Sequence, residues 1–337
     1  MKNYTIKDIA RLAGVGSSTV SRTINNYPGV NAETRERILE IIEKYNYTPN
    51  SNAKSLKQLN SQIICIIVKG ILNPFFSGII IEMQTNIERE GFVPVVSYID
   101  EQDDEIAYAK QLLSEKKGVG IIFLGGSAVN KEEELAKFNK PCVFATSSAR
   151  ECKVQRISSV SIDDRLGAKT AINYLMESGH KEILTIGGEI KQQDLIFHRY
   201  EGIRDAYKDK GQDFNEREMY VQSKFSYESA YKAIEKYMKC KRKFTAIFAM
   251  SDIMAIGAAK YITDIGMKIP DDISIIGFDG IEIAEFYTPT VATIRQPYIE
   301  IAQKSVELLI KSIDDESFFE HLLLRGELLK GNSVKLI

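Results

Sequence analysis

The sequence predicts an α/β protein with an all-helical head at its N-terminus and a core of two lobes, each built on a doubly wound parallel sheet. Its 337 residues suffice for two or three domains. Residues 1–48 show helical spacing, and from residue 63 short β-branched apolar runs alternate with helix-patterned segments. Such alternation is typical of parallel sheets covered by helices, and it occurs in two successive sets.

The head is expected to hold three short helices within residues 1–48. The capping box TIKD at residues 5–8 opens the first helix, which ends near Ala13. The second covers about residues 17–25, and the segment NYPG ends it. Asn31 caps the third helix. Apolar residues recur in that helix at helical spacing: Ile38, Leu39, Ile42 and Tyr45.

The second helix is rich in hydroxyl residues, which are mediocre helix formers because their side chains compete for backbone groups. Ala10 is small enough for two helices to cross, Gly14 suits a tight turn, and Val20 packs beneath them. These features predict a helix-turn-helix, whose second helix enters the major groove of DNA. The residues expected to reach base edges are Ser17, Ser18 and Arg22. Those expected to contact phosphates are Thr19, Ser21 and Asn25.

Charge is spread unevenly along the chain. Residues 1–62 hold nine Lys/Arg and five Asp/Glu, a net charge of +4, whereas the remainder holds 35 and 41, a net charge of −6. A basic head on an acidic core favours a polyanionic partner, double-stranded DNA, for the head alone. The alternative for the head is a helical module that docks on another protein.

The core is expected to span residues 62–337. Lobe 1 is predicted at about 62–160 and 292–320, and lobe 2 at about 161–290 and 321–337. The tail supplies the run VATIRQP, a helix from about Tyr298 to Ser312, and two late strand-like runs, EHLLLRGEL and SVKLI. The chain should therefore cross between the lobes more than once.

Motifs for catalysis or metal binding do not occur in the sequence. There is no phosphate-binding loop, dinucleotide-binding glycine motif or HExxH motif, and the three histidines are scattered. Cys65 and Cys142 lie in apolar strand-like runs, and Cys152 and Cys240 have no partner at a metal-ligand spacing. The expectation is a protein that is not an enzyme and that has no cofactor and no metal.

The opening MKNYTIKDIARL lacks the apolar segment of a signal peptide. No apolar run approaches the ~20 residues needed to cross a bilayer. We therefore expect a cytoplasmic protein with no membrane role, which argues against a secreted, transport-type sugar receptor.

A cleft between two lobes predicts a binding site for a small effector, because the carboxyl ends of parallel strands meet there. Candidate residues at or just after those ends are Phe75, Phe76, Ser127, Asp163, Arg199, Phe225, Ser251, Asp252 and Asp279. Aromatic rings can stack on a sugar or a base, and a planar guanidinium can hold hydroxyls or an anionic group. The structural alternatives are core packing for one of the two adjacent phenylalanines, and a helix cap or surface ion pair for Arg199 and Asp279.

Motifs along the whole chain resemble the lactose/galactose repressor family of bacterial transcription regulators. In the head and linker they are TIKDIARLAGVGSSTVSRTIN, VNAETRERILEIIEKYNYTPN and AKSL. In the core they are, in order, NPFF, DDRLGA, LMESGHKEI, HRYEGI, MSDIMAIGA, IPDDISIIGFDG and TIRQP. The resemblance implies a homodimer with a DNA-binding head, a hinge, and a core similar to periplasmic sugar-binding proteins. Two residues depart from the pattern: Gly16 replaces a capping serine, and Lys54 replaces a hinge arginine.

Residues 49–61 are expected to form the hinge. Their polar, weakly patterned sequence also permits a passive tether. The resemblance implies instead a short helix that folds only when paired with a second copy over the minor groove. Leu56 would be the apolar wedge, Ala53 would allow close approach of the two helices, and Lys54 would contact phosphate. Thr5 and Asn50 are further expected DNA contacts.

The implied function is a ligand-responsive repressor of a carbohydrate-utilisation operon. It would bind a palindromic operator as a dimer and respond to a sugar or sugar phosphate between its lobes. Two alternatives remain open: a global regulator controlled mainly by a protein coregulator, and a corepressor-dependent purine or nucleoside regulator.

Overall fold

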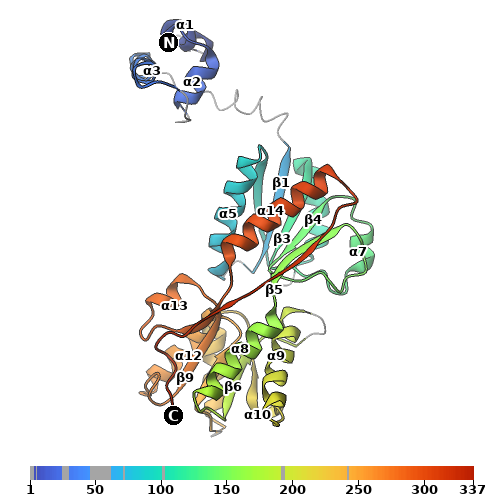
Figure 1. The fold of residues 1–337 in the computed structure, drawn as a ribbon, viewed down its shortest axis with the longest axis vertical. Coiled ribbons are helices and arrows are strands. Elements are labelled where there is room, and N and C mark those ends of the chain that lie inside the picture. Colours follow the sequence, from blue (N-terminus) through green and yellow to red (C-terminus); the bar gives the residue numbers. More distant parts are fainter. Residues whose placement is uncertain are drawn as a thin grey trace. The chain divides into compact units, whose positions relative to one another are not determined.

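The computed structural model describes residue 4 and residues 6–24, 30–45, 62–70, 73–100, 103–190, 194–240 and 243–337. For Ile6, Lys7, Ser18 and Ser21 it describes the backbone only. The chain divides into two compact units, Met1–Ser61 and Gln62–Ile337, which we call the head and the core (Figure 1).

The head contains the three predicted helices, α1 (Ile6–Ala13), α2 (Ser17–Ile24) and α3 (Ala32–Lys44). Gly14, in the turn, has φ +63°, a left-handed conformation that glycine adopts without strain. Asn31 caps α3 by accepting from the Thr34 amide at 2.8 Å. The buried residues of the head are Ile9, Ala10, Ala13, Val20 and Ile38.

The prediction that Leu39 belongs to the apolar face of α3 is wrong, because its side chain is 49% exposed. Ile41 packs against the head's core instead. Ile38 and Ile41 are three residues apart, which places them on one face of a helix, whereas Leu39 is turned by about 100° from Ile38.

The core has two lobes, each with its own sheet. The elements of lobe 1 are β1 (Ile63–Lys69), α5 (Phe75–Arg89), β2 (Val93–Ile99), α6 (Glu105–Lys116), β3 (Gly118–Leu124), α7 (Glu132–Ala136), β4 (Cys142–Ala145), β5 (Ile157–Ile162), α14 (Tyr298–Asp314) and β11 (His321–Leu324). The elements of lobe 2 are α8 (Asp164–Glu177), β6 (Ile183–Gly187), α9 (Leu195–Asp209), α10 (Glu216–Met219), β7 (Tyr220–Gln222), α11 (Tyr227–Met238), β8 (Ala246–Ala249), α12 (Asp252–Asp264), β9 (Ser274–Asp279), α13 (Glu282–Phe286), β10 (Ala292–Arg295) and β12 (Glu327–Leu329).

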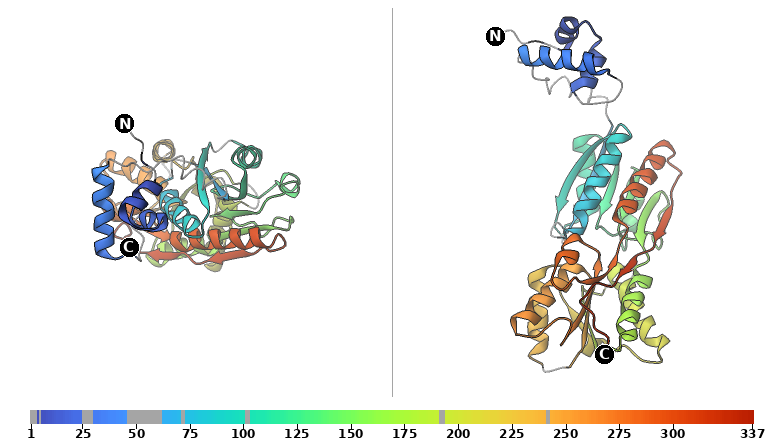
Figure 2. Two further views of the ribbon diagram at one scale, coloured as in Figure 1. Left: turned by 90° about the horizontal axis from the view of Figure 1, so that it is seen from above. Right: turned by 60° about the vertical axis from the view of Figure 1, so that its left-hand side comes forward.

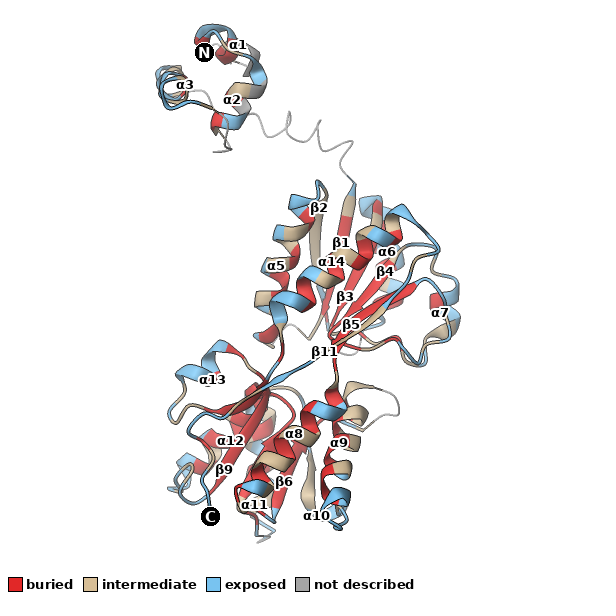
Figure 3. Ribbon diagram, viewed as in Figure 1, coloured by how far each residue is buried: buried red, intermediate tan, exposed pale blue. Residues whose placement is uncertain are grey.

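Within the described residues each sheet has six strands, in the orders β11-β5-β4-β3-β1-β2 and β12-β10-β9-β8-β6-β7. All neighbouring strands are parallel except β12, which is antiparallel to β10. Helices cover both faces of each sheet, as two views show (Figure 2). The central strands are buried along their length (Figure 3), which explains why they appear in the sequence as continuous apolar runs. The predicted α/β fold is confirmed.

The chain crosses between the lobes three times, after β5, after β10 and after β11. The prediction placed residues 292–320 in lobe 1 and residues 321–337 in lobe 2. It is wrong for the first strand of each of these two ranges. Strand β10 pairs with β9 in lobe 2, and β11 pairs with β5 in lobe 1.

The tail also differs from the prediction. The run at 320–328 is two strands, β11 and β12, in different sheets, because the chain changes lobe at Gly326. A Cβ atom there would lie 2.8 Å from Cγ2 of Ile294, closer than two carbon atoms normally pack, so a side chain at the crossing would require Ile294 to move. The run SVKLI at 333–337 is not a strand, although the Ser333 carbonyl accepts from the Ile275 amide at 2.8 Å.

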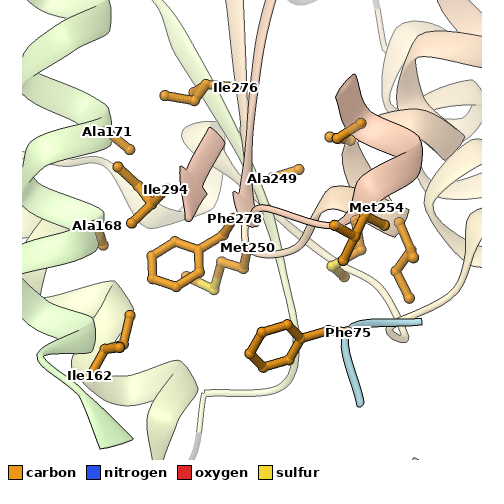
Figure 4. Packing of buried hydrophobic residues seen from close by; sticks show 14 of the residues in the cluster. Phe75, Ile162, Ala168, Ala171, Ala249, Met250, Met254, Ile276, Phe278 and Ile294 are labelled. Carbon is orange, nitrogen blue, oxygen red and sulfur yellow. The ribbon is translucent and has the colours of Figure 1, made fainter. Parts of the chain in front are cut away.

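A continuous buried cluster joins the two lobes. Phe75 of lobe 1 belongs to the same cluster as Met250 and Phe278 of lobe 2, and its ring points toward them (Figure 4). The carboxyl edges of the two sheets therefore face each other across packed side chains.

Cys65 and Cys142 are buried, as predicted, and none of the four cysteines forms a disulfide. No helix in the described part of the chain is long and apolar enough to span a bilayer. Among those residues, no three His, Cys, Asp or Glu side chains form a group that suits a metal ion.

Candidate functional site

Helix α2 presents part of its predicted DNA-contact set to solvent. Ser17 and Arg22 are exposed and Thr19 is half-buried. The Gly16 carbonyl accepts from the amides of Thr19 and Val20, so the glycine begins the helix without a side-chain cap. The side chains of Ser18 and Ser21 are not described, and Thr5, Asn25, Asn50, Ala53, Lys54 and Leu56 lie outside the described residues.

In lobe 2, the guanidinium of Arg199 is buried and has partners on several sides. Its side chain, on α9, is 4% exposed. Nε donates to Oδ1 of Asp164 at 2.7 Å, Nη1 donates to the Met250 carbonyl, and Nη2 lies 3.9 Å from Oδ1 of Asp279. Cζ lies 3.6 Å from the ring centroid of Phe278, a cation–π arrangement. The structure therefore brings two of the predicted effector residues, Arg199 and Asp279, together.

Asp279 connects the two lobes. Its Oδ1 accepts from Nε2 of Gln296 at 2.8 Å, and its Oδ2 accepts from Nδ2 of Asn73, in lobe 1, at 3.5 Å. Its backbone has φ +113°, which is strained for a residue with a side chain. Gln296 also donates its amide to the Asp279 carbonyl at 3.0 Å, so both backbone and side chain fix this residue.

Two buried carboxylates, Asp164 and Asp279, lie beside the Arg199 guanidinium, and a third, Asp252, lies near Asp279; burial raises the pKa of each. Burial raises the pKa of Asp279 to about 6, against the opposing charge of Arg199. Burial also raises the pKa of Asp164, again against Arg199. For Asp252, burial and the charge of Asp279 together raise the pKa to about 8. The carboxylates of Asp164 and Asp279, which the charge of Arg199 helps to keep ionised, supply acceptor oxygens that suit a ligand donating hydrogen bonds.

Three predicted effector residues have backbone-capping contacts. Oγ of Ser251 accepts from the Met254 amide at 3.3 Å and caps α12. Oδ2 of Asp252 accepts from the amides of Gly280 and Ile281 at 2.7 and 2.9 Å. Oδ1 of Asp163 accepts from the Leu166 amide at 2.9 Å and caps α8. Ser251 and Asp252 are fully buried, so they position the chain beside Asp279.

The predicted aromatic residues occupy different environments. Phe75 is a buried packing residue, whereas Phe76 is half-buried beside the carboxyl ends of β1 and β3. A side chain on Gly125 would lie 2.7 Å from Cζ of Phe76, so the ring covers that glycine. Phe225 is half-buried in lobe 2, where Gly188 leaves room for its ring.

Ser127 belongs to a charged group in lobe 1 that includes Glu105, Lys69 and Lys131. The Ser127 amide donates to Oε1 of Glu105 at 3.1 Å, and both lysine Nζ atoms lie 2.6 Å from Oε2. Although burial acts to raise it, hydrogen bonds from the two lysines hold the pKa of Glu105 below its usual value.

Several residues around the cluster were not predicted, although some of them lie in recognisable motifs. Asn73, Asp164 and Gln296 lie in the motifs NPFF, DDRLGA and TIRQP, but each acts across elements far apart in the chain. Lys69, Glu105 and Lys131 lie in none of the quoted motifs, and only the fold brings them together.

Comparisons with known proteins agree with this architecture. Residues 5–50 match the lacI family of bacterial regulatory proteins, and residues 172–334 match the periplasmic binding protein-like domain. The chain is 38% identical over 333 residues to the HTH-type transcriptional regulator MalR of Clostridium butyricum, covering 97% of this chain and 98% of that one. It is 30% identical over 316 residues to catabolite control protein A of Priestia megaterium, with 94% of each covered.

Among solved structures, the transcriptional regulator CelR in complex with cellobiose has a TM-score of 0.71 and 25% identity, covering 98% of this chain and 99% of that one. The resemblance found in the motifs is thus confirmed over nearly the whole length. The chain belongs to the lacI family of bacterial regulatory proteins and is a DNA-binding transcription regulator.

Proposed function

We propose that the chain is a ligand-responsive repressor that binds a palindromic operator as a homodimer. A small carbohydrate effector binds between the two lobes and changes the affinity for DNA. The observation that carries this proposal is the buried cluster around Arg199 and Asp279, where polar side chains of both lobes meet.

The cluster links effector binding to the arrangement of the lobes. Asn73 of lobe 1 reaches Asp279 of lobe 2 over 3.5 Å, a long and therefore weak hydrogen bond. An effector hydroxyl that donates to Asp279 replaces this direct bond with one through the ligand. A ligand that binds one arrangement of the lobes more tightly than another shifts the balance between them.

Carbohydrate chemistry fits the side chains at this place. The acceptor-rich cluster suits hydroxyl donors, and the guanidinium of Arg199 suits hydroxyl oxygens. The half-buried rings of Phe76 and Phe225 supply apolar surface of the kind on which a sugar can stack. The CelR relative, solved with cellobiose, supports this ligand class.

One flank of the core supports a dimer. Large apolar side chains exposed on α5, β2 and α13 are Ile81 (63%), Tyr98 (50%), Ile283 (49%) and Phe286 (77%). Helices α5 and α13 lie on the same side of the core (Figure 3). We call these four residues the apolar flank. Isologous contact through it would pair two heads, and two heads read a site of two symmetric halves.

Calorimetry with a panel of mono- and disaccharides tests the effector site. Arg199→Ala is expected to weaken binding at least tenfold, because a charge-assisted hydrogen bond contributes about 1.5–3 kcal/mol. The matched control is Arg204→Ala on the same helix, whose side chain is 56% exposed and pairs with Glu201. Equal affinities for the two variants would place the effector elsewhere, and wild-type protein that binds no sugar would favour control by a protein coregulator.

A further inference from the structure

Lobe 1 holds two lysine ammonium groups side by side at the carboxyl edge of its sheet. Lys69 ends β1 and Lys131 precedes α7, and Nζ of each lies 2.6 Å from the same oxygen, Oε2 of Glu105. The two nitrogens therefore lie within roughly twice that distance of each other. The lysine side chains are 18% and 24% exposed, whereas the carboxylate is 1% exposed. The buried carboxylate of Glu105 therefore holds two partly exposed ammonium groups in place.

The two ammonium groups keep unused donors. An ammonium has three N–H donors. Lys69 gives one to Glu105 and one to the Asp103 carbonyl at 2.9 Å, and Lys131 gives one to Glu105. In the described contacts this leaves one donor on Lys69 and two on Lys131. Lys69, Lys131 and Glu105 together carry a net charge of +1, and further charges close by in the sequence include Glu132, Glu133 and Glu134, which follow Lys131 in α7.

The two lobes therefore present unlike surfaces at their carboxyl edges. Lobe 1 offers two ammonium groups beside the Ser127 loop, whereas lobe 2 offers the carboxylates of Asp164 and Asp279 beside Arg199. Asn73, four residues after Lys69, reaches Asp279 and shows that this part of lobe 1 lies against lobe 2. A ligand that fits both surfaces is anionic at one end and rich in hydroxyl donors at the other.

We infer that Lys69 and Lys131 bind the phosphate of a phosphorylated sugar, whose hydroxyls donate to the Arg199–Asp279 cluster. This inference rests on the proposed function and narrows its ligand class. A phosphate monoester carries a charge of about −1.5 to −2 and three acceptor oxygens, which match three free donors better than a carboxylate does. Because Glu105 already orders both lysines, little conformational entropy is lost when the phosphate binds.

Calorimetry on the whole chain tests the inference with matched ligand pairs. Glucose, maltose and cellobiose are each compared with their 6-phosphate, and glucuronate serves as a carboxylate probe. At least one phosphorylated sugar is expected to bind at least tenfold more tightly than its parent sugar. Lys131→Gln is expected to remove most of this preference while changing the affinity for the parent sugar less than threefold, and Lys131→Arg is expected to retain it.

The control is Lys137→Gln. Lys137 is one of four lysines around a separate hollow of about 450 Å³ on lobe 1, which also includes Leu113 and Phe138. Loss of the phosphate preference in this variant, but not in Lys131→Gln, would move the anion site to that hollow and overturn the inference. Parent sugars that bind as tightly as their phosphates would refute the inference and leave the proposed function intact. If neither class binds, the inference and the proposed effector site both fail.

Discussion

Replacing Asp164 with asparagine tests how far the buried Arg199 depends on its nearest carboxylate. The two side chains are 7% and 4% exposed and join at 2.7 Å, so water cannot take the place of the lost charge. Removing one partner of a buried ion pair costs about 3–5 kcal/mol. Asp279, 3.9 Å from the guanidinium, still supplies a counter-charge, so we expect a loss near the lower end, about 3 kcal/mol.

The matched control is Asp205→Asn. Asp205 accepts two hydrogen bonds from Arg165, at 2.6 and 2.9 Å, between the same helices α8 and α9. The Arg165 side chain is 52% exposed, and exposed pairs contribute only about 0.2–1 kcal/mol. Urea unfolding followed by circular dichroism measures both variants, since the chain has no tryptophan. A loss of stability in Asp164→Asn no larger than in Asp205→Asn would refute the account of the buried cluster.

Three further predictions concern the DNA-reading helix, pH and the dimer. Arg22→Ala should cost about 1–3 kcal/mol of operator affinity and relax one base pair in each half-site, measured by gel shift and site selection; unchanged specificity would contradict base contact. The folded-state pKa values of Asp279 and Asp252, about 6 and about 8, exceed the ordinary 3.8. The folded core therefore binds more protons than the unfolded chain, and its unfolding free energy should fall as pH rises from about 4 to 8. Asp252→Asn should flatten the upper part of that curve in a urea titration at several pH values, and an unaltered curve would show that Asp252 is not the group responsible. Phe286→Glu should give monomers in sedimentation, and dimers that persist would place the interface away from the apolar flank.

Much of the fold was predictable because its signals are local. Gly14 and the apolar spacing around Ile38 mark the head, and continuous β-branched runs mark strands buried on both faces. The assignment of the last strands to the two sheets was not predictable. Strands β10, β11 and β12 are short, and the sheet that each one joins depends on where the chain crosses between the lobes, near Gln296 and Gly326. A run such as SVKLI has strand-like composition, but the neighbouring strand does not pair with it continuously.

The candidate site was predictable in part. Asp279 ends β9, Arg199 lies near the start of α9, and both lie in motifs of the family, so both were predicted as effector residues. Their partners Asp164 and Asn73 were missed because the contacts depend on how α8, α9 and the two lobes pack. Asp252 shows a second limit of the motifs. It was predicted to bind the effector because of its motif, but its carboxylate accepts from the backbone amides of Gly280 and Ile281.

The central claim is that an effector bound between the lobes controls affinity for the operator. The most direct test measures operator affinity of the 337-residue chain by fluorescence anisotropy, with and without the effector found by calorimetry. Wild-type protein should change affinity at least tenfold on saturation. Asp279→Ala should bind the operator as wild type does without effector and should not respond at the same effector concentration. An effector that saturates the wild-type protein and leaves its operator affinity unchanged would contradict the account.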